Sequence, residues 1–243
     1  YIWLILTIVI VISSFVGDAR SHVIKYAFSF LLGITISWDK FYCKMKHLVW
    51  AFFITPIVLF FLGVFNIFNI FAIDTYFDSE SLSEETIADT RTLVYQEVLL
   101  FAIDNDYIMT GRGIGKGYES LFQQRRAEET MSVSNTTDVN SSERQSEVGI
   151  LNIFTWGGVI YVVIYTLFYM SVVYYGIYRS KNRFSRNAAI FLAFYYFYSW
   201  VENFQSYSII YLSSFLFIAM TVSPYFREMS NYEIKQYIYK LLK

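Results

Sequence analysis

The chain has 243 residues and a formal net charge of −1, and it is 56% hydrophobic, 21% aromatic and only 16% charged. About a quarter of the residues of a soluble domain are charged, and a soluble domain of this length could not bury so much apolar surface without large exposed patches. With Cys43 as its one cysteine and only two histidines, the sequence has no basis for a disulfide framework or a Cys- or His-rich metal cluster, so we predict no metal site. We also expect no other cofactor and no nucleic-acid partner.

Six apolar segments predict membrane-spanning helices, since each approaches the roughly 20 residues that a span requires. The chain opens inside the first segment without a start methionine, and we therefore expect it to be the C-terminal part of a longer membrane protein. Long apolar runs without alternation favour helices over barrel strands. The predicted fold is an all-α, multi-pass integral membrane protein with spans at Tyr1–Val16, Val23–Trp38, Leu48–Ile73, Gly149–Tyr178, Asn187–Trp200 and Tyr207–Tyr225.

A polar loop, Asp74–Val148, lies between the third and fourth spans and holds 15 of the chain's 20 acidic residues. Within it, Ser83–Ile103 is predicted to be a helix, because serine and glutamate at its start suit a helix N-terminus. A glycine-rich turn follows at Gly111–Gly117. A large loop tethered to a helical bundle is where a membrane enzyme would keep its working surface.

Basic residues predict the orientation. The short loops Asp39–His47 and Arg179–Arg186 and the tail after Tyr225 together hold 11 basic and 3 acidic residues, and a six-span chain places all three on one side. That side is predicted to be cytoplasmic and the large loop extracytoplasmic. The predicted parts are then residues 1–73 with three spans, the loop 74–148, residues 149–226 with three more spans, and a cytoplasmic amphipathic tail, 227–243, whose helix Asn231–Lys243 should lie on the inner leaflet.

Arg91 is the first candidate for a functional side chain. It shares one face of the predicted loop helix with Ile87, Val94 and Val98, and no carboxylate lies three or four residues from it. An arginine on a packing face must find a partner elsewhere in the fold or bind an anion. A tertiary ion pair with a loop acid and anion binding are both open from the sequence alone.

Three other arginines are predicted on the same side of the membrane as Arg91. Arg112 lies in the glycine-rich turn, where backbone without side chains can approach a ligand; the alternative is a plain flexible turn. Arg20 lies in a tight outer turn and has an ion pair with Asp18 as its alternative. Together with Arg144, these side chains would suit a pyrophosphate-bearing lipid at the outer interface.

Two carboxylates complete the candidates. Glu147 lies where the loop returns to the membrane, and a general base there could deprotonate a hydroxyl group. Its alternative is a helix N-terminal charge that the macrodipole favours. Glu202, at the outer end of the fifth span, is a second carboxylate with the same alternative.

Three stretches of the chain carry a resemblance. Ser13–Arg20 looks like a span that ends in Ser and Arg at the outer face. Thr90–Tyr95 followed by Gly111–Gly115 is similar to an Arg-containing helix that leads to a G-x-G turn, and Ser146–Leu151 followed by Trp156–Tyr161 is like a returning helix with a Gly pair. In this order they resemble the C-terminal half of the O-antigen polymerase/ligase superfamily, the Wzy-like bacterial membrane glycosyltransferases.

The resemblance implies a GT-C-like, metal-independent glycosyltransferase in the bacterial cytoplasmic (inner) membrane. Such an enzyme polymerises undecaprenyl-pyrophosphate-linked repeat units into O-antigen, capsule or exopolysaccharide at the outer face. Its partners would be the lipid-linked glycan donor and acceptor, the bilayer, a chain-length regulator and a flippase. The implied catalytic residues are Arg91 and Glu147, and the implied substrate-binding residues are Arg20, Arg112 and Arg144.

Two alternatives to a polymerase are open. Ligases of the superfamily usually carry a histidine just before the returning helix, where this chain reads Glu143-Arg144-Gln145-Ser146-Glu147, so the polymerase branch is favoured. A polysaccharide flippase or transporter would line a central path with polar residues, but this chain has few charges in mid-span. A purely structural membrane subunit would have no use for unpaired outer arginines.

Overall fold

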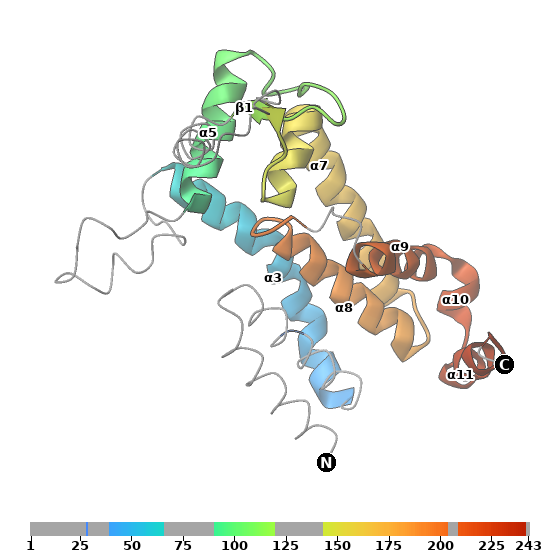
Figure 1. The fold of residues 1–243 in the computed structure, drawn as a ribbon. Coiled ribbons are helices and arrows are strands. Elements are labelled where there is room, and N and C mark those ends of the chain that lie inside the picture. Colours follow the sequence, from blue (N-terminus) through green and yellow to red (C-terminus); the bar gives the residue numbers. More distant parts are fainter. Residues whose placement is uncertain (1–27, 29–38, 66–89, 120–142, 204–208, 242–243) are drawn as a thin grey trace, which may run out of the picture. The chain divides into compact units, whose positions relative to one another are not determined.

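The computed structural model describes residue 28 and residues 39–65, 90–119, 143–203 and 209–241. The described helices are α3 (Asp39–Val64), α5 (Thr90–Asp104), α7 (Gly149–Tyr178), α8 (Arg183–Tyr198), α9 (Ile209–Val222), α10 (Pro224–Glu228) and α11 (Asn231–Leu241) (Figure 1). Two-residue strands β1 (Tyr118–Glu119) and β2 (Glu143–Arg144) pair antiparallel. The described chain is therefore helical, as predicted, apart from one short ladder that the sequence did not indicate.

The helix bounds differ from the predicted spans in informative places. α3 begins at Asp39, so Asp39–His47 is helical and not a loop, since its lysines are good helix formers and neither Gly nor Pro interrupts it. α8 and α9 have 16 and 14 residues, which is short for a span of about 20. The predicted tail helix is confirmed as α11. The first two predicted spans lie outside the described residues, Phe28 apart.

Two of the described helical segments are long and apolar enough to cross a membrane, Lys46–Val64 and Gly149–Tyr178. α9 adds a shorter apolar stretch, Tyr211–Val222. Length and composition make the two long helices candidate spans, while six spans and their orientation stay predictions.

The chain divides into two compact units. The first comprises residues 1–53, 169–196 and 207–243. Within it, the C-terminal part of α7 packs closely on α8, since a Cβ on Gly176 would lie 2.4 Å from the Ala189 Cβ. Phe53 stacks on Tyr196 with ring centroids 4.7 Å apart. Small and flat side chains thus allow close helix packing in this unit.

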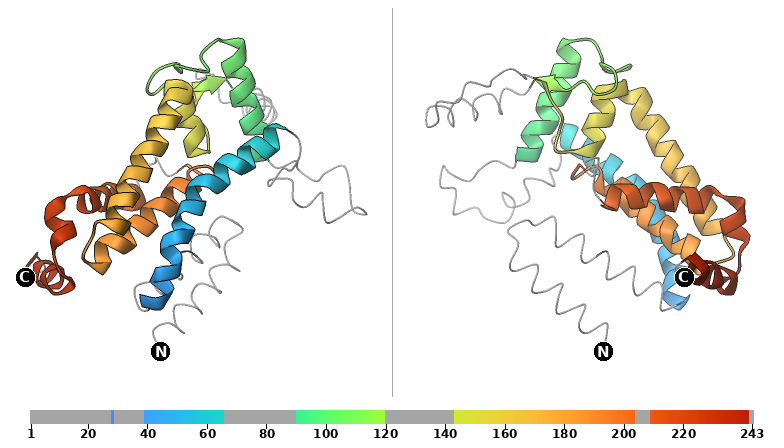
Figure 2. Two further views of the ribbon diagram at one scale, coloured as in Figure 1. Left: turned by 180° about the vertical axis from the view of Figure 1, so that it is seen from behind. Right: turned by 45° about the vertical axis from the view of Figure 1, so that its right-hand side comes forward.

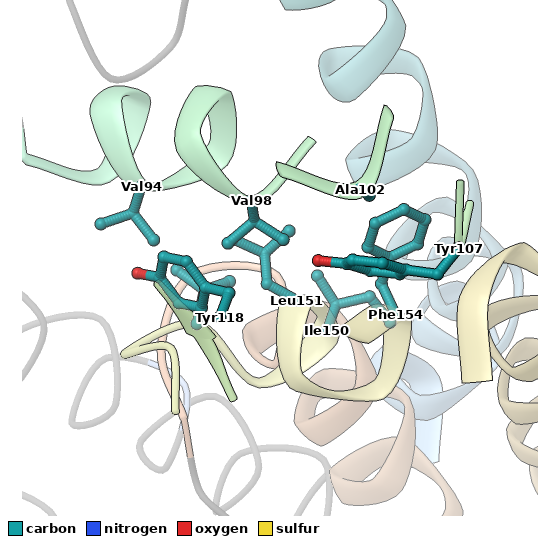
Figure 3. Close-up of a cluster of buried hydrophobic side chains, with 9 residues drawn as sticks. Val94, Val98, Ala102, Tyr107, Tyr118, Ile150, Leu151 and Phe154 are labelled. Atoms are coloured by element: carbon teal, nitrogen blue, oxygen red, sulfur yellow. The ribbon is translucent and has the colours of Figure 1, made fainter. Parts of the chain in front are cut away.

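The second unit comprises residues 54–168 and 197–206 and carries the candidate site. Its core joins one face of α5 to the first turns of α7, as Figure 3 shows. The buried members are Val94, Val98, Ala102, Tyr107, Tyr118, Val148, Ile150, Leu151 and Phe154. The predicted packing face of the loop helix is therefore confirmed at Val94 and Val98. Beside this core, the Tyr95 hydroxyl donates a hydrogen bond of 2.7 Å to the Trp200 carbonyl.

Candidate functional site

α7 is broken in its middle. Gly157 and Gly158 have φ/ψ angles of −140°/15° and 62°/−159°, so two helical segments meet there instead of one continuous helix. Figure 2 shows both segments, with the connection from α5 to β1 running close to their junction. The longer segment, Val159–Tyr178, has by itself the roughly 20 residues that a span requires. The predicted single span Gly149–Tyr178 has the expected ends but is interrupted.

The turn that follows α5 docks into this break, and we call residues 107–113 the docking turn. The backbone N–H of Arg112 donates to the Thr155 carbonyl at 2.8 Å, and the N–H of Gly113 donates to the Trp156 carbonyl at 3.0 Å. Both acceptors belong to the last turn before the break. The docking turn thus satisfies carbonyl groups that the break leaves without helical partners.

Hydrogen bonds are also donated in the opposite direction, from α7 to the docking turn. The N–H groups of Val159 and Ile160, just after the break, donate to the carbonyls of Ile108 and Met109 at 2.8 and 3.4 Å. In an unbroken helix, the two carbonyls before the break would accept from these same two N–H groups, four residues on. The docking turn therefore replaces two hydrogen bonds of the helix with four of its own.

Glycine is required at the two points of closest approach. Gly111 has a φ of 67°, and a Cβ on it would lie 2.3 Å from the backbone nitrogen of Gly157. Gly158 has a φ of 62°, and its Cβ would lie 2.3 Å from the carbonyl carbon of Met109. Any side chain at either position would push the turn out of the break. The glycine-rich turn and the Gly pair, two separate signals in the sequence, are halves of one contact.

Arg112 is held by the turn in which it lies. Its guanidinium donates a hydrogen bond of 2.6 Å to the Gly117 carbonyl. Its Cζ lies 5.2 Å from the centroid of the Phe101 ring and 6.0 Å from that of Tyr107. The side chain is half-buried. The turn that docks into the break thus carries a positive charge that is held in place, which is the property that anion binding requires.

Tyr107, at the start of the docking turn, was not singled out in the sequence. It is 6% exposed, and its hydroxyl has no hydrogen-bond partner among the described residues. Burial raises the pKa of Tyr107 to about 12, and the nearby charge of Arg112 opposes that rise. The indole N–H of Trp156 is also buried without a partner in the described part of the chain. Neither residue belongs to a recognisable motif. The one sequence signal that could have pointed to them is that they lie near the glycines of the docking turn and of the break in α7.

A buried polar pair fixes the start of α7. The Ser146 N–H donates to the Asn152 side-chain carbonyl at 2.6 Å, and the Asn152 amide donates back to the Ser146 carbonyl at 2.9 Å. The Ser146 hydroxyl accepts a hydrogen bond of 3.1 Å from the Val148 N–H. Glu147, which lies between Ser146 and Val148 in the chain, is exposed. Its backbone is therefore held in place, while its carboxylate faces outward.

The remaining predicted residues are placed to different extents. Arg144 lies in β2, opposite Tyr118 of β1, and the structure describes its backbone. Arg91 lies in the first turn of α5, and here too the structure describes the backbone. Arg20 lies outside the described residues. Glu202 is half-buried and accepts a hydrogen bond of 2.7 Å from the Tyr198 hydroxyl.

Five of the predicted residues belong to the second unit, namely Arg91, Arg112, Arg144, Glu147 and Glu202. No group of three His, Cys, Asp or Glu side chains that could hold a metal ion occurs in the described part of the chain. Comparison of the chain with protein-family models, with curated proteins and with solved structures finds no match.

Proposed function

We propose that this protein is a multi-pass membrane glycosyltransferase, similar to the Wzy-like polymerases, that joins undecaprenyl-pyrophosphate-linked repeat units in a bacterial cytoplasmic membrane. The acceptor hydroxyl oxygen attacks the anomeric carbon of the donor sugar, and the bond from that carbon to the pyrophosphate oxygen breaks. Undecaprenyl pyrophosphate leaves, and a base takes the hydroxyl proton. Because negative charge develops on the leaving pyrophosphate, the site needs fixed positive groups.

The broken apolar helix with its docked Gly–Arg turn is the observation that carries the proposal. Irregular backbone within an apolar span is tolerated where protein buries it or where it lines an aqueous site. Breaks in membrane helices are accordingly found at substrate sites. Here the break is occupied by the turn that carries Arg112, so polar backbone from a cation-bearing turn meets an apolar helix at one point.

Side-chain exposure supports a membrane location for the longer segment of α7. Ile150 and Leu151, before the break, are 2% and 3% exposed, whereas Ile164 and Leu167, after it, are 57% and 56% exposed. Large aliphatic side chains exposed along a helix are typical of a surface that faces lipid or another apolar partner. α3 also exposes a large apolar side chain, since Phe61 is 51% exposed.

The roles of individual residues follow from the resemblance. Arg91 and Arg20 bind the donor pyrophosphate, with Arg112 or Arg144 assisting. Glu147 is the base, and its exposure leaves it open to an acceptor and to proton exchange with water.

A transporter of lipid-linked glycans is the second candidate, because discontinuous membrane helices are also the usual sites of substrate binding in transporters. The break in α7 therefore favours it as well. A ligase that moves the glycan to another acceptor is a third reading within the same superfamily. The three functions differ in what accumulates when a functional residue is removed.

The test is the glycan profile of cells that carry Arg91→Ala, with protein levels in the membrane matched to wild type. Lys116→Ala is the control, since it removes an exposed positive charge from the same predicted loop. We expect single repeat units on the lipid carrier in Arg91→Ala and long polymer in Lys116→Ala. Polymer of normal length in Arg91→Ala would show that Arg91 is not a residue of the functional site.

The same profile separates the alternatives. Polymer that stays on its lipid carrier and is not transferred to its final acceptor indicates a ligase. Repeat units that remain at the inner face, protected from a glycosidase added outside, indicate a transporter.

A further inference from the structure

Two basic segments that are far apart in the sequence are joined in the first unit. Asn182 is fully buried, and its side-chain amide donates to the carbonyls of Phe226 and Met229 at 2.7 and 3.1 Å. The Lys181 N–H donates to the Arg227 carbonyl at 2.8 Å. The turn between α7 and α8 is thereby fixed against the chain around α10.

The same turn is also fixed to the start of α11. The Arg183 N–H donates to the Asn231 side-chain carbonyl at 2.7 Å. α11 begins with a capping box, in which the Ser230 N–H donates to the Glu233 carboxylate at 2.6 Å and the Glu233 N–H donates to the Ser230 hydroxyl at 3.3 Å. Hydrogen bonds to the Glu233 carboxylate from the backbone and the side chain of Ser230, helped by the charge of Lys181, hold the pKa of Glu233 below its usual range. Lys181 is therefore close to the first turn of α11.

The joined segments form a surface rich in positive charge, which we call the basic surface. Its exposed cations come from the turn and from α11: Arg179, Lys181, Arg183, Lys235 and Lys240. Glu228 and Glu233 are the exposed acids of the same segments. Arg227 lies between the segments, with its Cζ 4.9 Å from the Tyr175 ring centroid. Positive charge thus prevails on the basic surface, with five exposed cations against two exposed acids.

α11 adds aromatic side chains to the basic surface. Ile234 is 5% exposed, and Tyr237 packs edge-on against Phe226 at 5.5 Å, so one side of the helix faces the protein. Tyr232 and Tyr239 are 68% and 60% exposed. The Lys235 ammonium lies 5.9 Å from the Tyr239 ring. Tyrosine beside lysine is the composition of a membrane–water interface, where rings lie among headgroups and ammonium groups reach phosphates.

We propose that the basic surface docks on the headgroups of anionic phospholipids. Clustered Lys and Arg next to apolar helices attract a negatively charged leaflet, and the exposed tyrosines add the apolar contact that charge alone lacks. The short chain between the apolar stretch Tyr211–Val222 and α11 keeps the basic surface near the end of that stretch. The proposal rests on the proposed function only for the membrane location of the protein.

The test uses a fluorophore on Tyr239→Cys in a Cys43→Ser background, with the protein reconstituted into vesicles of phosphatidylcholine and phosphatidylglycerol. Bromine atoms that quench the fluorophore are carried by one lipid or by the other at equal mole fraction. We expect stronger quenching when phosphatidylglycerol carries the bromine. The preference should weaken as salt rises, because exposed charges are screened.

Two charge variants report on the mechanism. Lys235→Gln with Lys240→Gln removes two cations whose side chains make none of the bonds that join the segments, and it should reduce the preference for phosphatidylglycerol. Lys116→Gln, in the second unit, should leave it unchanged. Equal quenching by both lipids in the labelled protein that keeps all its surface lysines, or no quenching by either, overturns the proposal.

Other partners give different results. If inorganic phosphate at constant ionic strength removes the preference, the surface binds free anions and the lipid proposal is wrong. If the protein stays out of the vesicles altogether, the membrane location fails, and the proposed function fails with it. If lipid-linked repeats are polymerised while both brominated lipids quench equally, only the lipid proposal is wrong.

Discussion

Replacing Gly158 by alanine should expel the docking turn from α7. The φ/ψ of Gly158, 62°/−159°, lies in a region that is essentially restricted to glycine. Alanine favours the helical region instead, and its Cβ could not remain 2.3 Å from the Met109 carbonyl carbon. If α7 closes into a continuous helix, Thr155 can bond to Val159 and Trp156 to Ile160. The carbonyls of Thr155 and Trp156 and the N–H groups of Val159 and Ile160 thus stay hydrogen-bonded, now to one another. The docking turn loses all four of its hydrogen bonds to α7.

The backbone strain at residue 158 sets the expected size of the effect on amide exchange in the docking turn. Holding a residue other than glycine in this region costs about 1–3 kcal/mol, and the overlap with Met109 adds to that cost. Four docking hydrogen bonds at about 0.5–1.5 kcal/mol each contribute roughly 2–6 kcal/mol, so the strain alone approaches what holds the turn. Since 1.4 kcal/mol is a factor of about ten, the strain should speed amide exchange in the turn by at least about 5- to 150-fold.

Hydrogen exchange read by mass spectrometry is the assay. In Gly158→Ala, the N–H groups of Arg112 and Gly113 should exchange faster, while those of Val159 and Ile160 stay protected by their new helical partners. Gly115→Ala is the matched control, because Gly115 also has a positive φ of 85° but a Cβ there meets nothing within 4 Å. It should leave all four amides at wild-type rates.

Two results would count against an exchange of hydrogen-bond partners at the break in α7. If Val159 and Ile160 lose protection together with the turn, the break is not an exchange of hydrogen-bond partners. If no amide changes in Gly158→Ala, the turn does not depend on the glycine.

Three further predictions concern single side chains. Tyr107→Phe should be neutral or slightly stabilising, because the hydroxyl is buried without a partner among the described residues. Burial raises the pKa of Tyr107 from the ordinary 10.0 to about 12, so the unfolding free energy of wild type should fall by up to about 2.7 kcal/mol as pH rises from 10 to 12, and Tyr107→Phe should remove that part of the fall in denaturant titrations. Asn152→Ala should cost about 1–3 kcal/mol in the same titrations, because it leaves the buried N–H of Ser146 without its partner and the Ser146 carbonyl with only a 3.4 Å hydrogen bond from the Asn203 side chain; a cost near zero would show that water replaces the Asn152 amide. Arg112→Lys should lower polymer length at unchanged protein level, because an ammonium cannot both stack on Phe101 and reach the Gly117 carbonyl as the planar guanidinium does, and full-length polymer would place Arg112 outside the site.

Helical character and several helix positions were predictable from the sequence. Long apolar runs and a period of 3.6 residues come from the chain itself, so the ends of α7 and the buried face of α5 at Val94 and Val98 were correctly predicted. The start of α3 was not, because the prediction treated lysines as a loop signal, although lysine is a good helix former.

The candidate site was predictable only in pieces. The glycines of the turn and the Gly pair of α7 were both conspicuous, but nothing in the spacing tells that Gly111 packs on Gly157, which lies 46 residues further along the chain. That contact depends on which carbonyl and N–H groups the break leaves unpaired. Such pairing is a tertiary property, and for the same reason the roles of Tyr107, Trp156 and Asn152 could not be predicted.

The proposed linking of lipid-carried repeat units can be tested in a reaction with purified components. The protein in vesicles is supplied with undecaprenyl-pyrophosphate-linked repeat units and a metal chelator, and both lipid-linked glycan length and free undecaprenyl pyrophosphate are measured. We expect longer lipid-linked glycans, with one undecaprenyl pyrophosphate released for each linkage formed. Unchanged repeat units, from protein whose docking turn is protected from hydrogen exchange, would show that the protein does not link them.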